Sequence, residues 1–154
     1  MRIQMKKQQK GFSLIELLIV VAIILIIAAI AIPNLLRSKM AANEASAVGS
    51  MRTLNTSAVA YSTTYGSYPL AISNMGPSTS PSSTAADLID SVLSGGTKSG
   101  YTFTWTGNAG LSYTLAAAPT SPGVTGQRTF YTDQTGVIRA NASGAAGSSS
   151  TPIS

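Results

Sequence analysis

The chain has 154 residues, enough for one modest domain with an appendage, and it contains neither cysteine nor histidine. Their absence removes disulfide bridges, the usual catalytic bases and nucleophiles, and the commonest transition-metal ligands. The net charge is +5, but four of the ten basic residues lie in the first ten positions, and from Phe12 onward six Lys or Arg face five Asp or Glu. A nucleic-acid-binding domain needs a basic face, so we expect no nucleic-acid partner.

The first expected element is an apolar helix. Residues 17–32 are sixteen consecutive uncharged residues, and the 21 residues of the stretch 12–32 hold Glu16 as their only charge. A helix of that length measures about 31 Å, which matches the roughly 30 Å hydrocarbon core of a bilayer. The stretch is therefore built for lipid or for an equally apolar setting.

Two ordinary interpretations explain the length of this stretch but not its charge. A secretory signal peptide has a basic start, an apolar run and a small-x-small cleavage site, which Ala29-Ile30-Ala31 provides. A simple membrane anchor would be oriented by Lys6, Lys7 and Lys10, which hold the N-terminus in the cytoplasm. A carboxylate at the centre of a membrane-spanning helix costs about 2.5–3.5 kcal/mol, and neither interpretation accounts for it.

The segment Gly11-Phe12-Ser13-Leu14-Ile15-Glu16, followed by the apolar run and Pro33, resembles the N-terminal methylation motif of type IV pilins and prepilin-like pseudopilins. The resemblance implies that a prepilin peptidase cuts between Gly11 and Phe12, so that residues 1–11 are a cleaved basic leader. It also implies that the same enzyme methylates the new amine of Phe12. In such proteins the apolar run stays in the mature chain, and Glu16 and Pro33 serve assembly.

Phe12 and Glu16 are four residues apart and therefore share one face of a helix. Cleavage would place a positive amine on Phe12, and paired opposite charges offset the cost that each has alone in lipid. In the family that the segment resembles, this pair is proposed to form between neighbouring subunits and to select their register. The sequence leaves open whether the pair forms within one chain or between two.

The helical pattern continues beyond Pro33 as an amphipathic stripe. Polar residues such as Asn43, Glu44 and Ser50 mostly fall outside the stripe, and Gly66 suits a helix C-terminus. We predict one long N-terminal helix over residues 12–66, whose first half, 12–36, lies in the membrane or a filament core. Pro33 lacks a backbone donor and is expected to loosen or bend the helix. The apolar positions of the stripe are Leu36, Met40, Ala47, Met51, Leu54, Ala58, Tyr61 and Tyr65.

Residues 67–154 are expected to form a small globular head. Thr84 as N-cap and Asp87 in the first turn predict a short helix that stops at Gly95. Alternating side chains predict one hairpin from residues 101–106 and 111–115 and a second from 128–132 and 137–140. The Ala/Gly/Ser-rich tail from Asn141 is expected to be disordered. Aromatic packing is expected to hold the last hairpin, because the chain has no disulfide.

The predicted fold class is α+β, with the long N-terminal helix packed on a small antiparallel sheet of three or four strands. This matches the fold of the type IV pilins that the N-terminus resembles. The head offers little chemistry, since its only acids are Asp87, Asp90 and Asp133. A calcium site needs six to eight oxygen ligands, so we predict no metal, no cofactor and no catalytic residue, and hence no enzyme.

Sequence and resemblance together predict a structural subunit of a type IV pilus or pilus-like filament. The resemblance implies as partners further copies of the chain, the prepilin peptidase/methyltransferase, an assembly ATPase and a membrane platform. The precursor is expected in the bacterial inner membrane, single-pass with its N-terminus in the cytoplasm, and the filament at the cell surface or in the periplasm. One alternative is the major pseudopilin of a type II secretion system. An alternative of another class is an exported soluble binding domain released after Ala31.

Overall fold

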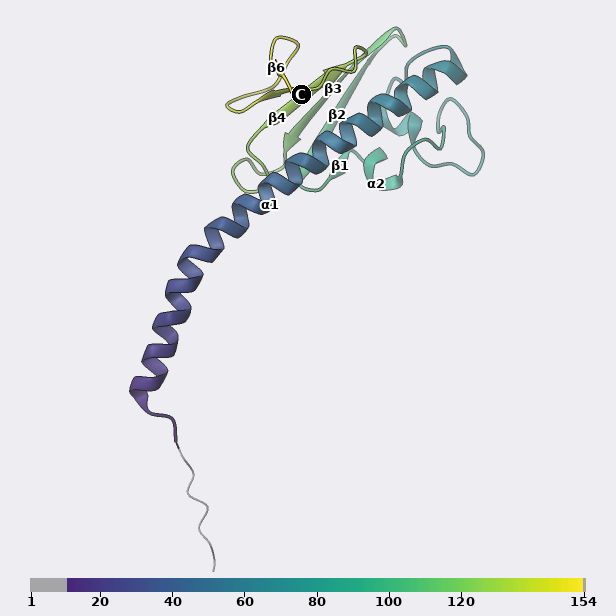
Figure 1. Cartoon of the computed structure of the whole chain (residues 1–154). Helices are drawn as coiled ribbons and strands as arrows, with labels where there is room; N and C mark the ends of the chain where they lie inside the picture. Colours follow the sequence, from purple (N-terminus) through teal and green to yellow (C-terminus); the bar gives the residue numbers. More distant parts are fainter. Residues whose placement is uncertain (1–10, 154) are drawn as a thin grey trace, which may run out of the picture. The chain divides into compact units, whose positions relative to one another are not determined.

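The computed structural model describes residues 11–153, and its longest element is helix α1, Leu14–Tyr65. The chain divides into two compact units between Leu36 and Arg37, so the first part of α1 belongs to one unit and the second part to the other (Figure 1). Pro33 lies inside α1 without ending it. The predicted leader, residues 1–11, falls outside the described part of the chain except for Gly11.

The C-terminus of α1 lies where the sequence predicts it. Tyr65 is the last helical residue, and Gly66 takes a left-handed conformation with φ of 76°. The N–H of Gly66 donates to the carbonyl of Ser62 at 2.9 Å, which satisfies one of the carbonyls that a helix end leaves without a partner. Glycine adopts this conformation without the steric penalty that a Cβ brings.

In the second unit, one face of α1 packs on an antiparallel sheet, which confirms the predicted α+β fold. The apolar stripe is buried from Ala47 to Tyr61, whereas Leu36 remains 49% exposed and Met40 and Tyr65 are only partly buried. The buried helix residues follow each other at spacings of four and three, as a helix face requires. They are Ala47, Met51, Leu54, Ala58 and Tyr61, and the largest sheet residues against them are Tyr101, Phe103, Tyr113, Leu115 and Phe130.

The sheet has six strands in chain order rather than the predicted three or four. Both predicted hairpins are confirmed, and the two additional strands are two-residue segments at the edges of the sheet, too short to leave a periodic pattern. In β2 the alternation is clear, because Tyr101 and Phe103 are buried while Thr102 and Thr104 are exposed. The strands are β1, Thr97–Lys98; β2, Tyr101–Asn108; β3, Ser112–Pro119; β4, Thr129–Asp133; β5, Arg139–Asn141; and β6, Thr151–Pro152.

The predicted short helix that begins at Thr84 is wrong in extent. Only α2, Ser91–Ser94, is α-helical, and its N-cap is Asp90, whose Oδ1 accepts the N–H of Leu93 at 2.6 Å. Asp87 has a left-handed φ of 53° instead of a helical one. The backbone N–H groups of residues 86–89 donate to carbonyls of residues 74–76, next to the 3₁₀ turn Ile72–Met75. Donors used in this tertiary contact are not available to a helix.

The tail from Asn141, predicted to be disordered, instead closes the sheet. Strand β6 pairs with β5, and the N–H of Ile153 donates to the carbonyl of Ile138 at 2.9 Å. Thr129 holds the intervening loop, because its Oγ1 accepts the N–H of Ala146 at 2.9 Å and donates to the carbonyl of Gly144. These polar contacts supply the order that the composition of the segment does not.

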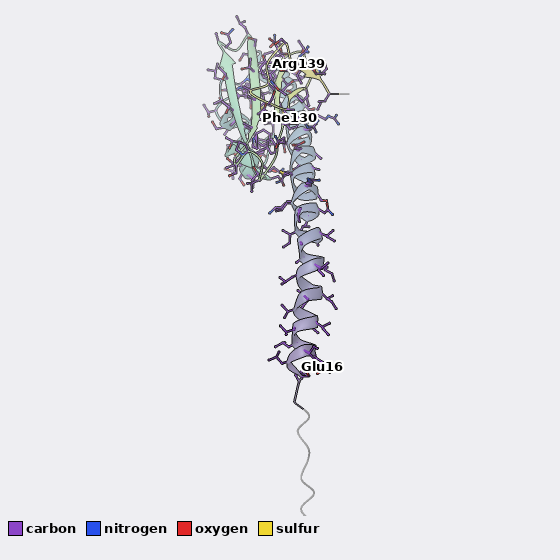
Figure 2. All side chains as sticks on the ribbon, turned by 90° about the vertical axis from the view of Figure 1, so that its left-hand side faces the viewer. Glu16, Phe130 and Arg139 are labelled. Atoms are coloured by element: carbon purple, nitrogen blue, oxygen red, sulfur yellow. The ribbon has the colours of Figure 1, made fainter. Side chains whose placement is uncertain are left out.

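Aromatic packing contributes to the last hairpin as predicted, but it is not alone. The Phe130 ring is buried and lies 5.9 Å from the Tyr101 ring, centroid to centroid. Arg139, which Figure 2 labels in the head with Phe130, donates from Nη1 to the carbonyl of Ser150 at 3.0 Å. One charged side chain and one ring therefore hold the two sides of the C-terminal segment.

Glu44 attaches α1 to the sheet, although the sequence analysis assigned it to the polar side of the helix. Its Oε1 accepts the N–H groups of Gln127 and Arg128 at 2.9 and 3.1 Å, and its Oε2 accepts Nε of Arg128 at 2.8 Å. Burial raises the pKa of the Glu44 carboxyl, but the hydrogen bonds from Gln127 and Arg128 outweigh it and hold the pKa below its ordinary value. The carboxylate is thus a charged anchor inside the fold.

We expect residues 37–154 alone to fold into a soluble monomer, because every residue of the hydrophobic core lies within this range. Circular dichroism should show mixed helix and strand, and thermal unfolding should be a single cooperative transition. A broad transition without cooperativity would show that the head depends on the first part of α1 and would contradict this prediction.

Within that fragment, Glu44→Gln should lower the free energy of unfolding by about 2 kcal/mol at neutral pH, since hydrogen bonds to a charged group are lost. The folded pKa of Glu44 is depressed, so the stability it contributes is present above its ordinary pKa of 4.5 and is lost as the pH falls through the folded pKa. Urea titrations over this range should show a pH dependence in the wild type that is reduced in the variant.

Asp87→Asn is the matched control, because Asp87 is an exposed carboxylate and Asn tolerates its left-handed conformation. It should leave both the stability and its pH dependence close to those of the wild type. Equal effects of the two substitutions would assign the pH dependence to general charge and not to Glu44.

Candidate functional site

The residues that the sequence analysis singles out surround the start of α1. Gly11 and Phe12 precede the helix in non-helical conformation, and the Phe12 side chain is 86% exposed. A Cβ added at Gly11 would meet no atom within 4 Å. The peptide bond between these residues therefore lies in an open segment, and a larger side chain at Gly11 has no clash with the described chain.

Glu16 caps its own helix. Ser13 is the N-cap of α1, since its carbonyl accepts the N–H of Leu17 at 3.2 Å, and the Oε2 of Glu16 accepts the N–H of Ser13 at 2.9 Å. Figure 2 shows Glu16 at this first turn. A glutamate at the third helical position that reaches back to the N-cap N–H is one half of a capping box, and the helix dipole also favours negative charge there.

This local role of Glu16 was not predicted, although the pattern Ser13-x-x-Glu16 is typical of a capping box. In the described chain the nitrogen of Phe12 is an amide bonded to Gly11, so no charged amine is present for Glu16 to meet. The bond from Ser13 engages one of the two carboxylate oxygens. A carboxylate has about four lone-pair sites, so capping leaves Glu16 able to accept a second donor.

The part of α1 that follows Glu16 is apolar on all sides. An 18-residue window within α1 reaches a mean hydropathy of 3.3 with none of it buried, which makes α1 long and apolar enough to cross a membrane. A signal sequence near the N-terminus would meet the same description of length and composition. Pro33 lies in this region, and because it has no N–H, the carbonyl four residues earlier lacks its usual helical donor.

The head residues that the sequence analysis considered for chemistry do not converge. Asp90 caps α2 and lies 3.6 Å from Nζ of Lys98, whereas Asp87 lies outside the helix and Asp133 accepts hydrogen bonds from Thr135. Within residues 11–153, no three acidic side chains come together as a group that could hold a metal ion. The feature that distinguishes this chain is therefore the start of α1.

Comparison with known proteins points to the same segment. The prokaryotic N-terminal methylation motif matches residues 6–32, a range that includes Gly11, Phe12 and Glu16. Over 38 residues of its N-terminal segment, the chain is 60% identical to the type IV wide pilus major component PilA4 of Thermus thermophilus. The aligned segment is 25% of this chain and 29% of that protein, so the similarity covers the apolar part of α1 and not the head. The N-terminal segment of this chain carries the signature of the type IV pilins, the prokaryotic N-terminal methylation motif.

Proposed function

We propose that the chain is a structural subunit of a type IV pilus or pilus-like filament. The observation that carries the proposal is a methylation motif at the start of a helix whose apolar surface the described chain leaves unburied. In this proposal residues 1–11 are a leader that a prepilin peptidase removes between Gly11 and Phe12, with methylation of the Phe12 amine. Residues 12–36 lie first in the inner membrane and then in the filament core, while the head, residues 67–154, faces outward.

The transfer of the apolar stem, residues 12–36, from the membrane into a filament depends on specific contacts. Lipid tails are as apolar as leucine, so moving the stem from lipid into a bundle of stems gains little from the hydrophobic effect. The large apolar side chains between Leu14 and Leu36 are therefore satisfied in either environment and do not by themselves select one axial position. A charge in this surface does select one axial position, because the opposite charge that pairs with it has to lie at the same level along the filament axis.

Glu16 fits that role in the proposal. After cleavage, the Phe12 amine of an incoming subunit carries a positive charge that a neighbouring Glu16 can accept. The bond from Ser13 keeps the carboxylate partly satisfied before assembly, and the pairing adds a second donor instead of replacing the first. An assembly ATPase and a membrane platform would supply the work of extraction.

Processing is the first test of the proposal. Mass spectrometry of the protein purified from its host should find an N-terminal peptide that begins with N-methylated Phe12. Substitution of Gly11 by a bulky residue should leave the precursor uncut, and because the space around Gly11 is open, that effect would arise at the peptidase and not in the fold. A mature chain that begins at Ile32 would instead identify an exported soluble domain.

The second test separates the charge of Glu16 from its capping role. Glu16→Gln keeps an oxygen that can accept the Ser13 N–H but removes the charge, whereas Glu16→Ala removes both. We expect both variants to be processed and both to yield few filaments, because a buried ammonium without its partner costs about 3–5 kcal/mol. Electron microscopy of sheared surface filaments provides the count.

Mixed expression sharpens this test. Glu16→Gln subunits should enter filaments made mainly of wild-type chains, where neighbours still supply carboxylates, but should not polymerise alone. Normal filaments from Glu16→Gln together with none from Glu16→Ala would show that the cap matters and the charge does not. If a strain forms filaments from this chain, and deletion of the chain stops its protein secretion, the result would favour a pseudopilin of a type II secretion system.

A further inference from the structure

Two adjoining hollows lie in the second unit, which comprises the head and the second part of α1, with volumes of about 390 and 240 Å³. Both are lined by Arg52 and Ile153, so they form one groove along this side of the helix. Small helix residues, Ala41, Ala45 and Gly49, leave the space open. We refer to this groove, which is lined by residues of α1 on one side and by Ile153 on the other, as the Arg52 groove.

The uncompensated charge in the groove belongs to Arg52. Glu44 also lines it, but its two oxygens already accept three hydrogen bonds, and Arg128 is its ion-pair partner. Arg52 is exposed and forms no ion pair with any residue in the described part of the chain. The groove therefore presents the positive charge of Arg52 beside the space that the small helix residues leave unfilled.

A complementary acid lies on the other side of the head. The sheet order places β1 and β6 at opposite edges, with the groove beside β6 and Asp90 beside β1, where it pairs with Lys98. Asp87 precedes Asp90 by three residues, and its neighbour Leu88 contacts α1, because the carbonyl of Leu88 accepts a hydrogen bond from the Oγ of Ser57 at 3.3 Å. Ser57 and Arg52 are separated by about 140° around a helix of 3.6 residues per turn, so the acid and the arginine occupy opposite sides of α1.

Asp87 is the acid least committed within its own chain. Its Oδ1 accepts one long hydrogen bond, from the N–H of Ser78 at 3.4 Å, and the residue is exposed. Asp90 is bound to Leu93 and Lys98, and Asp133 accepts both the N–H and the hydroxyl of Thr135. Of the acidic residues described in the second unit, Asp87 is thus the one available to another molecule.

We propose that the Arg52 groove of one copy receives the Asp87 loop of the next copy. The proposal rests on the filament function proposed above and names the contact between heads. The two surfaces lie on different sides of the same head, so the contact is heterologous: each copy offers one surface and uses the other. Such contacts propagate into open helical assemblies unless the rotation closes a ring. Opposite charges also orient the incoming head before close contact forms.

Charge reversal tests the pairing in full-length protein expressed in its host. Arg52→Glu and Asp87→Arg should each lower filament yield about tenfold, which corresponds to about 1.4 kcal/mol for each added subunit. The double variant Arg52→Glu/Asp87→Arg should restore filaments, because the pair is rebuilt with its charges exchanged. Lys39→Glu makes the same change in net charge at an exposed residue outside the groove and should leave the yield unchanged.

The pairing would be overturned if each single variant is impaired and the double variant does not recover filaments. A normal filament yield from either single variant would also overturn it. Absence of filaments from the wild-type chain would instead overturn the filament function on which the docking rests. Gly49→Leu gives a readout without charge: a Cβ there meets no atom within 4 Å, so the fold should persist while the filled groove rejects its occupant. Full assembly of Gly49→Leu would contradict the proposal.

The absence of cysteine permits a direct observation of the contact. In a chain carrying Arg52→Cys and Asp87→Cys, a short bismaleimide should join copies into a ladder of multimers in sheared filaments. Lys39→Cys with Asp87→Cys is the control and should give monomers. A ladder in the control, or monomers from the Arg52 and Asp87 pair in intact filaments, would place the contact elsewhere.

Discussion

The structure depends on one constraint, which is that the apolar side chains in the first part of α1 have no cover within the described chain. The most apolar window of the helix is unburied, and its surface is apolar all round and not along one stripe. Such a helix is stable in lipid or among similar helices but not in water. The constraint explains why residues 17–36 carry no charge and why the second unit has to complete a core of its own.

Two glutamates on the same helix meet opposite requirements. Glu44 is held by three hydrogen bonds from Gln127 and Arg128, and its role is to fix α1 against the start of β4. Within the described chain Glu16 accepts one hydrogen bond, from the N–H of Ser13 at the start of the same helix. A carboxylate whose two oxygens both accept hydrogen bonds within the fold stabilises that fold. A carboxylate with free acceptor sites can accept a hydrogen bond from a second donor and keep the bond that it already has. The difference between the two sites is one of hydrogen bonding, not of residue type.

The elements that the sequence predicts correctly have local signals: the periodic stripe of α1, its end at Gly66 and the two alternating hairpins. The misjudged elements depend on distant residues. Glu44 lies 83 positions before Gln127, and the ordered tail depends on Thr129. The loop at Asp87 is non-helical because its N–H groups bind residues 74–76. The cap formed by Ser13 and Glu16 is an exception among the features that were not predicted, because its sequence signal is local. The same residues also belong to the processing motif, to which Glu16 was assigned.

In the proposed filament, register at the stem and docking at the head act on the two units of the chain separately, with Glu16 in the first unit and Arg52 in the second. A subunit that moves along a filament by one helical turn shifts about 5.4 Å, which exceeds the reach of an ion pair. Such a shift of the stem would break the proposed Phe12–Glu16 pair, and such a shift of the head would break the proposed Arg52–Asp87 pair. In this proposal each contact selects the axial position of its own unit, and neither has to be strong alone. A filament assembled in this way would be specific in register, while its apolar stems would remain free to slide during insertion.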